Sequence, residues 1–153
     1  MKEDDLKDIL DSVPAIGRVM RTEYAHVPLV PQAKQSVRFT KFGPAYPSKK
    51  KVKYMKDLKG FLRSSFAADP MTGPLRITLL FCFPWRKTEK KDVRAKGWSL
   101  MDKRPDIDNL MKPFFDSCND ICFDDDGQIV AVHAIKIRTE EPGIFVKLEE
   151  LSI

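Results

Sequence analysis

The sequence predicts a single α+β domain, in which a mixed or antiparallel sheet carries two helices on one face. The segment 75–83 is mostly apolar, which is typical of a buried strand. The segments 48–66 and 109–122 repeat apolar residues at helical spacing, and the last 25 residues contain two β-rich segments separated by a turn. A chain of 153 residues has the size of one ordinary domain.

The predicted element order is β-α-β-α-β-β after a short helical leader. Apolar residues at helical spacing end at Val13, just before Pro14, which predicts a partly helical leader over residues 1–25. The domain proper then spans residues 26–153. Residues 26–39 combine β-forming residues with two prolines, which indicates an edge strand that runs into a loop.

The helix expected at 48–66 is basic and amphipathic, and the strand at 75–83 follows a turn. Residues 84–104 show no apolar periodicity and are rich in Lys and Arg, so we expect a basic surface loop.

In the helix expected at 109–122, Asp108 or Asn109 is the predicted N-cap, which places Pro113 at the end of the first turn. The segments 129–138 and 143–151 are expected to pair as an antiparallel hairpin.

The composition excludes several classes of protein. The longest apolar run, 77–83 with an interruption at Thr78, is far shorter than the ~20 residues that span a bilayer. The acidic start of the chain is unlike a secretory signal, so we expect a cytoplasmic protein. We also expect no membrane partner and no organic cofactor. Cys82, Cys118 and Cys122 lack the spacing of a zinc site and are predicted to be small core residues.

The two parts of the chain carry opposite charge. Residues 1–104 hold 23 Lys and Arg against 11 Asp and Glu, a net charge of +12. Residues 105–153 hold 4 against 11, a net charge of −7. A basic part can neutralise a polyanion, and gathered carboxylates repel one another unless a cation lies among them.

The acidic part contains a possible cation site. In an extended segment Asp106 and Asp108 point to the same side, and Lys112 follows Asp108 at helical i+4 spacing. Asp126, returned by the turn after the helix, can supply a further ligand, with Asp125 as an alternate. Mg²⁺ prefers such oxygen ligands, and a bound metal can activate water and stabilise a phosphate transition state.

Two simpler interpretations compete with a metal site. Asp106 and Asp108 can cap a helix, and the three aspartates at 124–126 can form a turn. A calcium loop is excluded, because a loop with Gly127 as its fixed glycine has Cys122 and His133 at two ligand positions.

The motif Pro105-Asp106-Ile107-Asp108-Asn109-Leu110-x-Lys112, followed by Asp116, Asp125-Asp126-x-Gln128-Ile129 and Lys136, resembles the signature of the RusA family of Holliday junction resolvases. The resemblance extends over about residues 26–151. The segment Pro31-x-x-Lys34-x-x-x-Arg38-Phe39, followed by Gly43-x-x-Tyr46, is similar to the basic entry segment of that family.

The resemblance implies that Asp106, Asp108 and Asp126 are catalytic metal ligands and that Lys112 is an essential lysine. Asp125, Asn109, Gln128 and Lys136 would support them. It also implies a homodimer that nicks two strands of a four-way DNA junction with Mg²⁺ or Mn²⁺, in DNA recombination and repair, and a phage or prophage origin.

For such a protein, the candidates for contacts with the DNA backbone are Lys34, Arg38, Lys49, Lys50, Lys51, Lys53, Arg86, Lys87, Lys90, Lys91, Lys103, Arg104 and Lys136. Three alternatives remain open from the residues themselves. The chain can be a branched-DNA-binding module without catalysis, a broader nuclease for branched DNA, or an interaction protein whose acidic part binds a basic partner.

Overall fold

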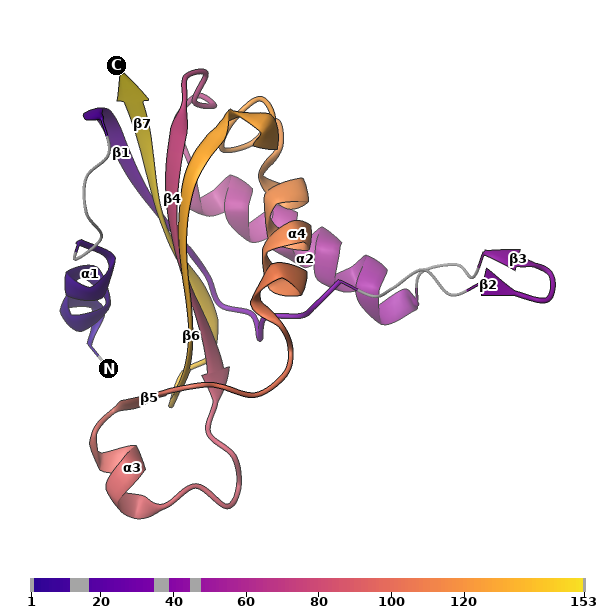
Figure 1. The fold of residues 1–153 in the computed structure, drawn as a ribbon, viewed down its shortest axis with the longest axis vertical. Helices are drawn as coiled ribbons and strands as arrows, with labels where there is room; N and C mark the ends of the chain where they lie inside the picture. The colour runs from indigo at the N-terminus through magenta and orange to yellow at the C-terminus, as the bar shows by residue number, and fades with distance from the viewer. Residues whose placement is uncertain (1, 12–16, 35–38, 45–47, 153) are drawn as a thin grey trace.

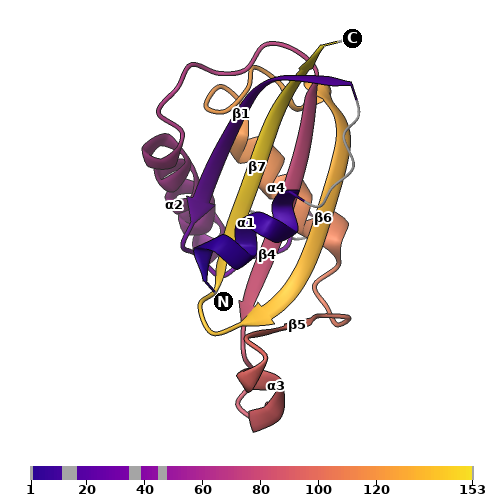
Figure 2. The same ribbon diagram turned by 90° about the vertical axis from the view of Figure 1, so that its left-hand side faces the viewer.

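The computed structural model describes residues 2–11, 17–34, 39–44 and 48–152, and it contains a five-stranded sheet with helices on both faces (Figures 1 and 2). The strands of the sheet are β1 (Arg18–Val27), β4 (Leu75–Pro84), β5 (Trp98–Leu100), β6 (Ile129–Thr139) and β7 (Gly143–Ser152). The helices are α1 (Glu3–Asp11), α2 (Lys49–Ser65), α3 (Lys91–Ala95) and α4 (Ile107–Cys118), with a 3-10 turn η1 (Asp126–Gln128) and a separate hairpin of β2 (Phe39–Thr40) and β3 (Gly43–Pro44).

The strand order is β1-β7-β4-β6-β5, in which β4 and β6 are parallel and the other neighbours are antiparallel. Figure 2 shows α1 in front of the sheet and α2 and α4 behind it. The predicted α+β fold with two helices on one face is therefore confirmed. None of the described helices is long and apolar enough to cross a membrane.

Strand β4 forms the centre of the core, as the apolar segment 75–83 predicts. All nine residues from Leu75 to Phe83 are buried. Side chains alternate along a strand, so Ile77 and Phe81 join the core under α2 and α4, whereas Cys82 packs near Leu6 of α1 on the opposite face. Both faces of β4 therefore need a covering layer.

Helix α2 agrees with its predicted range. Ser48 is the N-cap, and its side chain accepts a hydrogen bond from the backbone N–H of Lys51 at 3.3 Å. Tyr54, Leu58 and Leu62 are buried at helical spacing, which directs one face of α2 into the core.

Helix α4 starts earlier than predicted, with Asp106 as the N-cap, so Pro113 lies in the second turn rather than at the end of the first. A proline cannot donate to the carbonyl four residues before it, which here is that of Asn109. The backbone N–H of Lys34 donates to this carbonyl instead, at 2.7 Å. The helix also ends at Cys118 rather than near residue 122, because Asp120 takes a positive φ of 65° in the turn that follows.

The edge strand is displaced from its predicted place. β1 covers Arg18–Val27, whereas the sequence places a strand within 26–39 and a leader over 1–25. Residues 18–25 therefore belong to the sheet, where they pair with β7. Only Ala25 and Val27 of this strand are buried, so its apolar signal is weak.

The predicted hairpin of the last two strands is wrong. β6 and β7 run in opposite directions, but β4 lies between them and pairs with both. The turn at 140–142 therefore passes the end of β4. A strand buried on both faces needs a hydrogen-bonded neighbour on each side, and β4 obtains them in this way.

The basic segment 84–104, expected as a loop, contains α3 and the short strand β5, which pairs with the end of β6. The leader helix α1 packs on the sheet through Leu6 and Leu10. Its last residue, Asp11, accepts hydrogen bonds from Lys147 at 2.6 Å and from the Tyr24 hydroxyl at 3.1 Å. The three cysteines are buried free thiols, as predicted.

A buried ion pair joins β4 to β7 on the α1 face of the sheet. Arg76 donates to Glu149 through Nε to Oε1 at 2.8 Å and through Nη2 to Oε2 at 2.5 Å. Both residues are 3% exposed. The hydrogen bonds to Glu149 raise the pKa of Arg76, so the guanidinium stays charged.

Removing one partner of this pair should destabilise the protein strongly. We expect Glu149→Leu to lower the free energy of unfolding by about 3–5 kcal/mol, because it removes the carboxylate that accepts two hydrogen bonds from the buried Arg76 charge. The double variant Arg76→Met/Glu149→Leu should recover most of that loss. Urea denaturation measures both, with Lys53→Ala as the control, since it breaks the exposed Lys53–Asp57 pair and should cost less than about 1 kcal/mol. A double variant as unstable as the single one would contradict this account.

Candidate active site

The start of α4 presents two aspartates to solvent. Asp106 occupies the N-cap position, but its side chain makes no capping hydrogen bond. Asp106 and Asp108 are both exposed. Asp106 therefore lies where a helix cap would lie without performing that role, which weakens the interpretation of this pair as simple capping residues.

The loop that leads into α4 is fixed by a lysine of β6. The Lys136 ammonium donates to the backbone carbonyls of Lys103 at 2.7 Å and Pro105 at 2.8 Å. The Arg104–Pro105 peptide bond in this loop is cis. Lys136, predicted to contact DNA, thus anchors the segment that carries Asp106 to the sheet.

Lys112 joins the middle of α4 to the acidic turn. Its ammonium donates to Asp116 Oδ1 at 2.9 Å and to Asp126 Oδ2 at 3.3 Å. These hydrogen bonds, with that to Asp116 the stronger cause, raise the pKa of Lys112. The structure therefore brings together Lys112 and Asp126, two of the predicted site residues, and holds the lysine in its charged form.

Asp116 belongs to this cluster but was not among the predicted catalytic residues. It lies one helical turn after Lys112, and its carboxylate is the nearer of the two partners. The i, i+4 spacing of a lysine and an aspartate is the sequence signal that indicates such a pair.

Two aspartates of the turn, Asp125 and Asp126, have different roles. Asp125 caps η1, because its carboxylate accepts from the Gly127 N–H at 2.9 Å and the Gln128 side chain accepts from the Asp125 N–H at 2.8 Å. A Cβ at Gly127 would lie 2.6 Å from the Asp125 carboxylate, so a side chain there would displace this carboxylate from its capping position. Asp126 is left to face Lys112. The Asp125 side chain thus serves the turn, whereas the Asp126 side chain contacts Lys112.

Gln128 ties this turn to the body of the protein. Its amide nitrogen donates to the carbonyls of Met71 and Gly73, each at 3.0 Å. The same loop is held from the other side by Glu150, whose Oε2 accepts from the N–H groups of Thr72 and Gly73, each at 2.9 Å. The position of Asp126 therefore depends on β7 and on the loop before β4.

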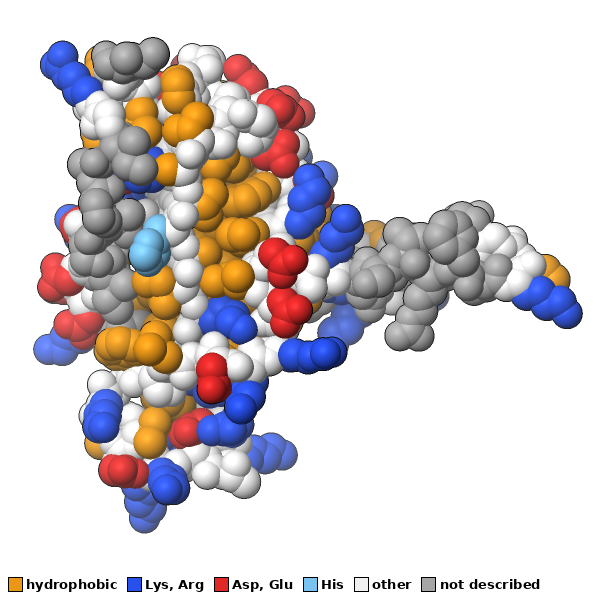
Figure 3. Space-filling model, viewed as in Figure 1, with side chains coloured by type: hydrophobic (Ala, Val, Ile, Leu, Met, Phe, Trp, Pro, Cys, Tyr) orange, Lys and Arg blue, Asp and Glu red, His pale blue; other side chains and the backbone are white. Residues whose placement is uncertain are grey.

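The chemistry of these side chains suits a hard cation, since the candidate ligands are all carboxylates. Among the residues that the structure describes, however, no three His, Cys, Asp or Glu side chains converge to hold a metal ion. Figure 3 shows acidic side chains in separate groups along the surface near α4, with basic side chains between them. The carboxylates predicted from the sequence are thus present near α4, but the described ones do not form an assembled metal site.

The basic residues predicted to contact DNA are mostly open to solvent. Lys51 and Lys136 are half-buried and donate to backbone carbonyls, and burial lowers the pKa of Lys51. Arg86 is paired with Glu89 at 3.3 Å, and Arg38 lies outside the described residues. The exposed candidates are Lys34, Lys49, Lys50, Lys53, Lys87, Lys90, Lys91, Lys103 and Arg104.

Helix α2 carries further basic residues that were not among the candidates. Lys56, Lys59 and Arg63 are exposed and continue the series begun by Lys49 and Lys53. Helical spacing along 48–66 is the sequence signal for this basic face.

A family model described as Endodeoxyribonuclease RusA matches residues 28–149, from the end of β1 to β7. This chain belongs to the RusA family. The RusA match includes α4, η1, β6 and the first seven residues of β7. The chain is also similar to a Bacillus subtilis (strain 168) protein named "Uncharacterized protein YqaN", with 30% identity over 108 residues that cover 67% of this chain and 76% of that protein.

Membership of the RusA family implies endodeoxyribonuclease activity, which is the hydrolysis of phosphodiester bonds in DNA, and Holliday junction DNA as the substrate. Resolvase nucleases of this kind generally use a divalent metal. The carboxylates around α4 are the described residues whose chemistry suits that metal, and Lys112 is the cation among them.

The raised pKa of Lys112 can be tested directly. We expect the ¹³C-methylated lysine signal of Lys112 to titrate above the ordinary value of 10.5. Asp116→Asn should lower this pKa more than Asp126→Asn does, because Asp116 makes the closer contact. The stabilisation from this cluster is then present below pH 10.5 and is lost as the pH rises through the raised pKa. Equal titration of Lys112 in all three proteins would contradict the observed contacts.

Gln128 should be important for both the acidic turn and stability. We expect Gln128→Ala to lower the free energy of unfolding by about 2–3 kcal/mol, because it removes one hydrogen bond to the turn and two to the loop before β4. Urea denaturation measures the loss. Glu140→Gln, at an exposed position in another turn, is the control and should be nearly neutral. A Gln128→Ala protein as stable as the control would show that these hydrogen bonds do not hold the turn.

Proposed function

We propose that this chain is a structure-specific DNA endonuclease that resolves Holliday junctions by Mg²⁺-dependent paired nicking, in recombination and repair. We propose that Mn²⁺ can also serve as the metal ion. We further propose that the chain is encoded by a phage or a prophage. The observation that supports it most is the contact of Lys112 with Asp126, which joins the two motifs that resemble the RusA signature. This contact lies within the matched region 28–149.

In this proposal Asp106, Asp108 and Asp126 bind the metal, with Asp125 as the alternate ligand. The bound metal supplies an activated water and neutralises charge on the phosphate. Because the three ligands do not converge in the described structure, binding requires that the carboxylates move together. Lys112 is already protonated, so it can donate to the phosphate or to the leaving oxygen.

DNA reaches this site along the basic residues. Lys49, Lys50 and Lys53 on α2 lie on the element that packs beside α4, and the basic segment 84–104 lies below them in Figure 1. Contacts with phosphates position a duplex without reading its sequence, and they make binding dependent on salt. We therefore assign the exposed basic candidates to the arms of the junction.

The paired character of the reaction requires two equivalent sites. A four-way junction presents two equivalent phosphates, and a homodimer with a two-fold axis provides one site for each. We include the homodimer in the proposal on this ground and on the RusA resemblance.

The decisive experiment is cleavage of a synthetic four-way junction. We expect the purified chain to nick two strands of the junction in Mg²⁺ and to cut flap, Y and linear duplex DNA more slowly. Asp106→Asn should bind the junction but reduce cleavage by at least 10²-fold, because it removes a ligand without removing a basic contact. Gel electrophoresis of end-labelled strands measures cleavage, and a mobility shift measures binding.

Asp120→Asn serves as the matched control, since Asp120 is exposed after α4 and is not assigned to the site. It should cut as the unmodified chain does. An Asp106→Asn protein with full activity would remove that carboxylate from the proposal, and equal cleavage of all four substrates would indicate a broader nuclease for branched DNA.

A second candidate is a branched-DNA-binding module without catalysis. It is favoured by the absence of three converging metal ligands among the described residues. This candidate predicts salt-sensitive junction binding in EDTA and no nicking with any divalent ion. The same cleavage assay therefore separates it from the endonuclease.

A further inference from the structure

The two edges of the sheet differ in how well their backbone groups are protected from pairing with another chain. At one edge, β1 carries Arg18, Arg21 and Glu23, and its register with β7 shifts between Val19 and Arg21. Charges and bulges of this kind prevent an edge strand from pairing with another chain.

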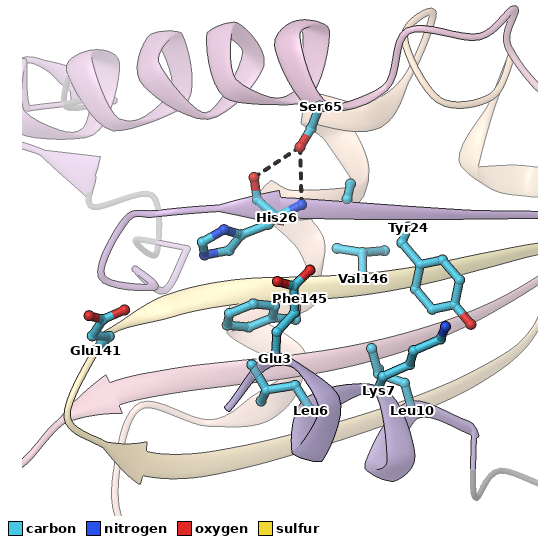
Figure 4. A pocket seen from close by; sticks show the side chains of 11 residues that line it. Glu3, Leu6, Lys7, Leu10, Tyr24, His26, Ser65, Glu141, Phe145 and Val146 are labelled. Carbon is cyan, nitrogen blue, oxygen red and sulfur yellow. Dashed lines mark hydrogen bonds between the residues drawn. The ribbon is translucent and has the colours of Figure 1, made fainter. Parts of the chain in front are cut away.

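The far end of β1 is closed as well. The Ser65 hydroxyl of α2 contacts both backbone groups of His26, accepting from the N–H and donating to the carbonyl, each at 3.1 Å. Figure 4 shows Ser65 above His26 with both contacts. β1 is therefore an edge whose pairing capacity is blocked.

The other edge lacks these features. β5 pairs with β6 only from Ile137 to Thr139, and Met101 N–H donates to the Lys136 carbonyl just before them. Backbone groups alternate in direction along a strand, so those of Val132 and Ala134 point to the same side as Lys136. In the described part of the chain no strand pairs with this side of β6 before Lys136.

The open part of β6 is apolar and uncharged. No Asp, Glu, Lys or Arg occurs between Gly127 and Ile135. Val130 is 63% exposed and Val132 is 42% exposed, and Leu100 of the neighbouring β5 is 73% exposed. Figure 3 looks onto this edge and shows hydrophobic side chains on either side of a white run of backbone. Such an edge is a template for strand addition.

We propose that this edge is the dimer interface and that its occupant is the β6 strand of a second copy of the chain, paired antiparallel about a two-fold axis near Val132. This inference deepens the homodimer of the proposed function by assigning its surface. Identical edges related by a two-fold axis must pair antiparallel, and this closes the assembly at two copies.

Charge favours a second copy as the occupant. In antiparallel pairing about a two-fold axis, the residue at the axis faces its own copy and its neighbours face nearby residues, which is destabilising where like charges meet. The uncharged stretch from Gly127 to Ile135 avoids that cost, whereas an axis at Arg21 of β1 would place two guanidinium groups together. The pairing also covers Val132 of both copies and joins the two sheets into one.

Dimerisation itself provides the first test, because it does not depend on nuclease activity. Val132→Lys puts two ammonium groups beside the axis, so we expect its dimer dissociation constant to rise at least tenfold in sedimentation equilibrium. Val19→Lys is the matched control, since Val19 is 37% exposed on the opposite edge strand, and its dimer should be unchanged. Circular dichroism checks that both variants are folded.

Cross-linking provides a second test that does not require a destabilising charge. Val132→Cys should form a covalent dimer with a short bismaleimide, whereas Val19→Cys should not. The native thiols give little background, because Cys82, Cys118 and Cys122 are buried and burial raises the pKa of Cys82 to about 12.

A monomeric unmodified chain, a dimer unaffected by Val132→Lys, or cross-linking at Val19→Cys alone would overturn the assignment of β6. A dimer that forms elsewhere and still nicks the junction in pairs would leave the proposed function intact. A β6 dimer that never nicks would support the interface and count against the nuclease. The two proposals can therefore fail separately.

Discussion

The burial of β4 on both faces is the constraint on which the rest of the structure depends. Nine consecutive residues, Leu75 to Phe83, are withdrawn from water, so neither one layer of helices nor one neighbouring strand can satisfy them. β6 and β7 supply the backbone partners, α2 and α4 cover one face, and α1 covers part of the other. The position of α4 follows from this requirement, and with it the position of Lys112.

Three polar side chains connect the segments that carry the acidic residues to the buried sheet. Lys136 of β6 donates hydrogen bonds to the loop before Asp106. Gln128 donates to the loop before β4, and Glu150 accepts from that same loop. Each of these contacts joins a side chain to backbone groups, so it fixes where a chain segment runs rather than which charge it meets. The surface carboxylates are thus supported by elements of the buried sheet.

The sequence predicted correctly the elements whose apolar residues follow the pattern of burial in the fold. Segment 75–83 and the helix beginning near Lys49 have apolar patterns that burial imposes, and both were found within about two residues. β1 was missed because only Ala25 and Val27 of its ten residues are buried, so its pattern carries little of the core. The hairpin of β6 and β7 was wrong because a turn at 140–142 looks the same whether the strands pair or a third strand lies between them.

In the candidate site, too, contacts within one helix could be predicted from the sequence, whereas contacts between distant segments could not. The i, i+4 spacings around Lys112 are local, and they place Asp108 and Asp116 one turn to either side of it. The contact with Asp126 depends on how a turn 14 residues away returns, which Gln128 and the loop at Met71–Gly73 decide. Pro113 illustrates the point most clearly, because the carbonyl that it leaves without a helical donor is taken by Lys34, 75 residues earlier in the chain. A pattern can name the residues of such a site, but only the fold determines which of them meet.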